Sequence, residues 1–245
     1  MAALLSTALC ALLVAPSAAQ ADPSGGTVIG TVVIPNPAKR GEPAVKDKGF
    51  VPRMRNPLKP PKAFNPIPYL IVVLEGNTVP SVDQEPPGLP VKVVLLGHSF
   101  ERPLSAVMTG GSVEITNKGR NSPRLHAPSN PDLVPADPIN PRGTRLIKKF
   151  PAKYEAVEIR DHDSAHLSGH IVGIPHPYFS TLSKDGKFEI KGVPKGVWKV
   201  RIWFKDGWLD MREYTVDVPA KRTTKPQKIT LPDQLKVKSA AEASK

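Results

Sequence analysis

The chain has 245 residues, of which 29 are proline, and its formal net charge is +12. Proline at more than twice its usual share of about 5 % excludes a largely helical protein, because each interior proline costs a helix about 3 kcal/mol. Hydrophobic residues make up 40 % of the chain and charged residues 23 %, so we expect a buried core rather than wholesale disorder.

The first residues have the pattern of an export signal. Residues 4–15 form an uncharged apolar run, and the small-x-small cleavage pattern follows at residues 19–21. We therefore predict a signal peptide over residues 1–21, a periplasmic or secreted protein, and no transmembrane segment. Cys10 lies inside this segment, so the mature chain has no disulfide, no thiolate nucleophile and no cysteine metal ligand.

The positive charge is concentrated in two flanking segments. Residues 35–62 carry eight basic and two acidic residues, and residues 219–245 carry seven and two, while the rest is nearly neutral. The proline-rich insertion 35–68 should be extended and partly polyproline-like. Such flanks suit an envelope protein or an anionic surface polymer as partner. We expect no nucleic acid, since aromatic residues are not interleaved with the basic ones. The alternative is that the charge serves solubility alone.

Strand signals dominate the remainder of the chain. Turn signals at residues 184–187 and 205–208 separate some of these strands, and six prolines in the long loop 121–143 argue against a ladder strand or helix there. The pattern predicts one all-β sandwich over residues 27–218, including the insertion 35–68 and the loop 121–143, followed by the basic C-terminal segment 219–245. Two small sandwiches are the alternative. The predicted strands are 27–34, 69–76, 91–97, 112–117, 170–175, 187–193, 197–204, 212–219 and 226–232, with weaker candidates at 144–150 and 154–161.

Several motifs along the chain resemble a known group of exported proteins. They are GTVVI, VVLEG, SFERPLSAVMTGGSVEITN, RNSPRLHAPSN and HPYFSTLSKDGKFEIKGVPKGVWKVRIWF, within residues 27–208. In these the chain resembles the cupredoxin-like (plastocyanin-like, methylamine-utilisation-like) class. The last motif is also similar to the carboxypeptidase regulatory-like β-module. The resemblance implies a Greek-key β-sandwich and says little about activity.

The same resemblance bears on copper. A blue-copper site in such a family uses a histidine after the asparagine strand, then a cysteine, a second histidine and a methionine in one later loop. His126 stands where the first histidine is expected, but Asp161, Ser164 and Leu167 stand at the other three positions. A type 1 copper centre needs the cysteine thiolate, so we expect none, and no resident cofactor.

Histidines also gather at one place in the sequence. His162, His166 and His170 recur every fourth residue, which puts them on one face of a helix but about 13 Å apart on a strand. With a neighbouring aspartate, and with His126, a looped geometry could hold Cu²⁺ or Zn²⁺. The alternative is a polar surface loop. His176, in the HPYF turn, is predicted to hold that turn by a hydrogen bond.

Enzyme signatures are lacking from the sequence, which has no nucleophile elbow and no Walker or Rossmann glycine loop. We therefore expect a non-enzymatic exported binding or scaffolding protein of the cell envelope, docking through its basic proline-rich flanks. One alternative is a histidine-rich copper or zinc protein. Another is a carbohydrate-binding module with an exposed Trp203 or Trp208, although a core position for Trp198 and a surface position for Trp203 are the simpler interpretation.

Overall fold

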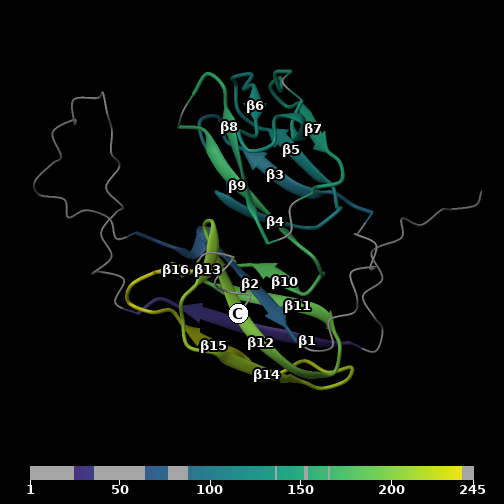
Figure 1. Cartoon of the computed structure of the whole chain (residues 1–245), viewed down its shortest axis with the longest axis vertical. Coiled ribbons are helices and arrows are strands. Elements are labelled where there is room, and N and C mark those ends of the chain that lie inside the picture. The colour runs from purple at the N-terminus through teal and green to yellow at the C-terminus, as the bar shows by residue number, and fades with distance from the viewer. Residues whose placement is uncertain are drawn as a thin grey trace, which may run out of the picture.

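The computed structural model describes residues 25–35, 64–76, 88–135, 137–151, 154–164 and 166–238. These residues form strands and two short 3-10 helices, η2 (Ile67–Tyr69) and η3 (Pro131–Leu133), so the fold is all-β as predicted. The strands gather in two bodies stacked one above the other (Figure 1). The central sandwich contains β3 (Val91–Leu95), β4 (Leu104–Met108), β5 (Val113–Asn117), β6 (Leu125–His126), β7 (Thr144–Ile147), β8 (Ala156–Asp161) and β9 (Ser168–Ile174).

The terminal sandwich combines strands from both ends of the chain. Its strands are β1 (Gly26–Val33), β2 (Leu70–Glu75), β10 (Phe179–Thr181), β11 (Lys187–Val193), β12 (Gly196–Phe204), β13 (Gly207–Leu209), β14 (Tyr214–Val218), β15 (Gln227–Thr230) and β16 (Val237–Lys238). One of its sheets has the order β11-β1-β15, in which β15 runs parallel to β1. The other has the order β10-β2-β12-β13-β16, and β14 pairs with the first half of β12.

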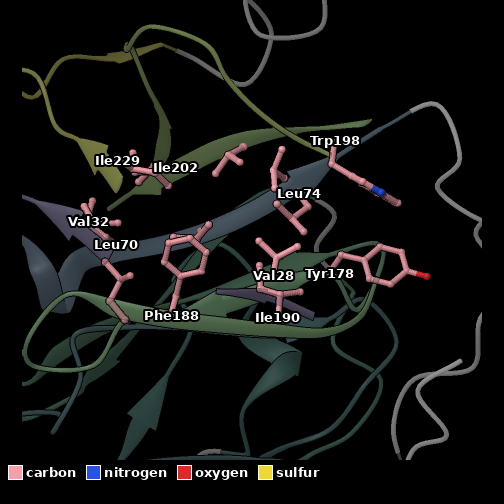
Figure 2. Packing of buried hydrophobic residues seen from close by; sticks show 14 of the residues in the cluster. Val28, Val32, Leu70, Leu74, Tyr178, Phe188, Ile190, Trp198, Ile202 and Ile229 are labelled. Atoms are coloured by element: carbon pink, nitrogen blue, oxygen red, sulfur yellow. The ribbon is translucent and has the colours of Figure 1, made fainter. Parts of the chain in front are cut away.

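The core of the terminal sandwich lies between these two sheets (Figure 2). Alternate residues of each strand point into it, as the period of two in a strand requires. Trp198, Val200 and Ile202, which alternate along β12, all belong to this core, and Trp198 thus has the core position predicted for it. Phe188 and Ile190 of β11 meet them from the opposite sheet.

The central sandwich is built in the same way. A sheet of order β3-β5-β7 packs on a sheet of order β4-β9-β8-β6, and a second core fills the space between them. The pairs β3–β5 and β4–β9 are parallel, whereas the remaining pairs of this sandwich are antiparallel.

A third, smaller core joins the two sandwiches. Residues of β2, β12 and β13 contact residues of β4 and β9 there. Leu70, Val72 and Leu74 of β2 face the terminal core, while the alternate residues Ile71 and Val73 face the junction. Burial on both faces explains why β2 reads as one continuous apolar run.

The long loop 121–143 differs from its prediction, because Leu125 and His126 form the short strand β6 and η3 lies within it. Neither residue of β6 is a proline, so both retain the N–H that a ladder needs, and they pair with β8. Pro131 occupies the start of η3, where a missing N–H costs nothing. The predicted absence of strand and helix from this loop is therefore wrong between the prolines and at the helix start.

Several sequence predictions lie outside the described residues. These are the signal peptide 1–21, residues 36–63 of the proline-rich insertion and residues 239–245 of the C-terminal segment. The described part of that segment contributes β15 and β16, and Ile229 is fully buried in the terminal core. Among the described residues, none lies in a helix that has the length and apolar character needed to cross a membrane.

Candidate functional site

The predicted histidine cluster lies at one end of the central sandwich. β6 pairs with the end of β8, so that His126 is opposite Arg160, and the N–H of His162 donates to the carbonyl of Arg124 at 2.8 Å. The rings of His126 and His162 meet edge to face, with centroids 6.0 Å apart. The structure thus brings the histidine of loop 121–143 beside the start of the loop that follows β8.

An ionic network surrounds this histidine pair. Arg124 pairs with Asp163 at 2.7 Å, and the hydrogen bond from Arg124 lowers the pKa of the Asp163 carboxyl. His162 Nδ1 lies 3.5 Å from the same carboxylate. His126 Nδ1 is enclosed and has no hydrogen-bond partner within the described structure. A bound cation would explain an imidazole nitrogen that has no hydrogen-bond partner, since imidazole nitrogen is a common ligand of Cu²⁺ and Zn²⁺.

His170 is not part of this pair. It lies on β9 opposite Glu158, one strand further across the sheet and two residues further along it than His126. Burial lowers the pKa of His170. His166 is exposed in the loop between β8 and β9. Across the described ranges, no three or more His, Cys, Asp or Glu side chains are grouped so that they could hold a metal ion. The metal site therefore stays a prediction. Of its four predicted histidine ligands, only His126 and His162 lie side by side.

The second candidate site is basic and lies on the terminal sandwich. The segment before β15 runs beside β1, where the N–H of Thr27 donates to the carbonyl of Arg222 at 3.0 Å and the N–H of Thr224 donates to the carbonyl of Thr27 at 2.8 Å. β15 then continues in parallel along β1 and forms one edge of its sheet. The exposed cations of this segment, named here the basic edge, are Lys221, Arg222, Lys225 and Lys228.

The basic edge is a fixed array of charge. Ile229 points into the core, so Lys228 points to the outer face of the sheet, where its register neighbour is Thr31 of β1. Lys187 of β11 is paired with Thr31 from the other side, which adds a further exposed cation to the same row. Within the described residues, none of the four cations of the basic edge forms an ion pair, and residues 219–228 contain no acid.

His176 lies at the junction of the two sandwiches, and the hydrogen bond that the sequence predicts for it in the HPYF turn is confirmed. The backbone N–H of Tyr178 donates to its Nδ1 at 3.3 Å, which holds the turn. Nε2 lies 3.1 Å from the hydroxyl of Tyr154. Because Nδ1 accepts, we assign the ring proton to Nε2, which donates to the tyrosine. His176 is only 3 % exposed, and burial lowers its pKa to about 4.

All three tryptophans are buried. Trp198 is fully enclosed, and Trp203 and Trp208 are 1 % and 3 % exposed. Trp203 packs edge to face on Trp208, with centroids 5.0 Å apart, in the core that joins the sandwiches. The surface position predicted for Trp203 is wrong, because β12 is covered on both faces along its second half. These side chains form no exposed platform for a sugar ring.

Taken together, strand pairing and cores define a protein of the all-β, sandwich class. A scan against protein-family models gives no match, and a search of curated proteins gives none. Among solved structures, the chain is similar to a Cu(I) form of an amicyanin mutant, with 11 % identity and a TM-score of 0.29, and to an oxidized amicyanin mutant, with 13 % identity and a TM-score of 0.30. Each match covers 42 % of this chain and 97 % of that one.

Proposed function

We propose that this protein is a non-enzymatic, exported binding or scaffolding protein that docks on an anionic component of the cell envelope. The observation that carries the proposal is the basic edge, with four exposed cations on a segment fixed by β1 and β15 and no ion pair among the described residues. Cations without paired acids keep their full field toward solvent, so they attract an anionic surface. The role of a degenerate cupredoxin-like sandwich with a carboxypeptidase regulatory-like segment is, in this proposal, to present that edge.

The backbone that carries these cations is already fixed by its pairing with β1, and this favours binding. A lysine on a mobile tail must lose backbone freedom when it binds, whereas one on a paired strand has already lost it. The basic edge therefore contributes more affinity per charge than a free tail of the same sequence. The net charge of +6 in residues 35–62 would add to the attraction from the second flank.

Association with an envelope fraction tests this proposal. The variant Lys221→Gln/Arg222→Gln/Lys225→Gln/Lys228→Gln removes four positive charges from the basic edge. Its matched control, Lys118→Gln/Arg120→Gln/Lys148→Gln/Lys149→Gln, removes four exposed charges from the central sandwich. We expect the first variant to stay in the supernatant when envelopes are sedimented, and the control to sediment like the wild type.

The outcome that contradicts the proposal is equal sedimentation of both variants. If both lose binding equally, net charge alone governs association, and if both keep it, charge plays no part. Protease treatment of the envelopes before sedimentation distinguishes an anionic protein from an anionic polymer as the partner.

A second candidate function is binding of Cu²⁺ or Zn²⁺ by the pair of His126 and His162. It rests on their ring contact and on the enclosed, unpartnered Nδ1 of His126. Equilibrium dialysis of the wild type, of His126→Ala/His162→Ala and of the exposed control His98→Ala tests it. Sub-micromolar binding that the double variant alone loses supports the candidate, and equal binding by all three proteins contradicts it.

A further inference from the structure

A cleft between the two sandwiches has a chemistry that the proposed function does not use. It encloses about 380 Å³, which is within the usual range for a small-molecule site. Its walls come from both bodies. Ile67, Leu182 and Lys184 belong to the terminal sandwich, and Lys92 and Arg102 belong to the central one. A ligand in this cleft would therefore contact both sandwiches at once.

Arg102 is the unusual residue of the cleft. Its Nη2 donates to the carbonyl of Leu182 at 2.8 Å, which links the sandwiches. Its Nη1 is enclosed by protein atoms and has no hydrogen-bond acceptor in the described structure. An enclosed hydrogen-bond donor without an acceptor lowers the stability of the folded state, and a donor on a charged guanidinium lowers it further. Burial accordingly lowers the pKa of Arg102.

Four other arginines of the protein have an ion-pair partner that Arg102 lacks. A carboxylate lies within ion-pair distance of Arg124, Arg145, Arg160 and Arg201. Within the described residues, Arg102 has no such partner, although it is more enclosed than Arg124 or Arg160. The charge of Glu101 acts on Arg102 only from beyond ion-pair distance. A half-buried guanidinium held in place without a carboxylate in direct contact is the arrangement expected when that contact comes from a ligand.

The other residues that line the cleft also favour a negatively charged ligand. Lys92 and Lys184 line it and form no ion pair in the described ranges, and Glu101 is the one acid among the lining residues. The hydroxyls of Ser105 and Ser183 supply further hydrogen-bonding groups. Three cations, one carboxylate and two hydroxyls around an apolar floor suit a compact anion with several oxygen atoms.

We propose that the cleft between the sandwiches binds a small ligand bearing an oxyanion, either phosphate or carboxylate, with Arg102 as its anchor and Lys92 and Lys184 as the flanking charges. The ligand oxyanion supplies the carboxylate-like counter-charge that the guanidinium lacks at ion-pair distance. Because the two walls come from different sandwiches, the bound anion strengthens the link that Arg102 already makes to Leu182. This site is separate from the basic edge.

Calorimetric titration of the full chain at low ionic strength tests the site. Inorganic phosphate and malonate serve as the two probes, and they distinguish a phosphate site from a carboxylate site. We expect saturable binding of at least one probe with one site per chain. The variants Arg102→Met and Lys92→Gln/Lys184→Gln should each weaken it at least tenfold, whereas the control Lys118→Gln/Lys148→Gln should stay within twofold of the wild type.

The proposal is overturned if neither probe binds saturably, or if the cleft variants bind as the wild type does. The lysine pair is exposed, so this variant decides the question if Arg102→Met does not fold. Sedimentation with envelopes keeps the two proposals apart. The lysine-pair variant should sediment like the wild type, and the variant of the basic edge should bind the phosphate or malonate probe unchanged.

Discussion

Acid should destabilise this protein through His176, and the size of the effect follows from the structure. The pKa of an unfolded histidine is about 6.5, and burial lowers that of His176 to about 4. The folded state thus favours the neutral ring. Its contribution to stability is complete above pH 6.5 and is lost as the pH falls from 6.5 to 4. Linkage between these two values gives a loss of about 2.5 kcal/mol between pH 7 and pH 4.5.

Denaturant unfolding at a series of pH values measures this loss. Other groups titrate over the same range, so the informative quantity is the difference between the wild type and His176→Gln, which shares every other group. We expect the wild type to lose about 2.5 kcal/mol more than the variant between pH 7 and pH 4.5. The control His98→Gln removes an exposed histidine and should follow the wild type. Parallel pH profiles for the wild type and His176→Gln would refute the reasoning.

Two single substitutions and one double-mutant cycle test the packing and the polar contacts. Trp198→Ala, in the terminal core, should cost about 4 kcal/mol in the free energy of unfolding, measured by chemical denaturation. Asn117→Ala should cost about 2–3 kcal/mol by the same measurement, because the Asn117 amide donates to the carbonyls of Asn121 and Ile139 at 2.7 and 2.8 Å. A loss below 1 kcal/mol would contradict either expectation. A double-mutant cycle between Glu75 and Arg201, 2.9 Å apart and partly exposed, should give a coupling of about 1 kcal/mol that shrinks in 1 M salt, and a coupling unaffected by salt would argue against an ionic contact.

The strands that the sequence predicts are those whose residues have a clear pattern. β12 alternates because one face of its first half is solvated, and β1 is rich in β-branched residues. β4 was missed, although all five of its residues are buried. It faces the central core on one side and the junction on the other, so no polar residue marks an outward face, and its Ser and Ala weaken the strand signal. β2 is also buried on both faces, but its unbroken run of large apolar residues marks it as a strand, whereas Ser and Ala interrupt that run in β4.

The candidate sites also depend on contacts between residues that are far apart in the sequence. His126 and His162 are 36 positions apart and meet because β6 pairs with β8, a contact that the resemblance to cupredoxins suggested but that spacing alone did not. The spacing of four that drew attention to His170 is without consequence, because this residue lies on a strand rather than a helix. Arg102 has no motif around it. Its Nη1 lacks an acceptor in the folded chain, as Nε of Arg145 does, but among the described residues no carboxylate lies within ion-pair distance of Arg102, whereas Asp137 pairs with Arg145.

The most direct test of the account is the salt dependence of binding to a soluble polyanion, such as fluorescent dextran sulfate followed by anisotropy. If the basic edge is the contact, the slope of log K against log salt should be shallower by about three to four for the variant Lys221→Gln/Arg222→Gln/Lys225→Gln/Lys228→Gln than for the wild type. The control that removes four charges from the central sandwich should keep the wild-type slope. Equal slopes for the wild type and the basic-edge variant would contradict the claim that this edge is the docking surface.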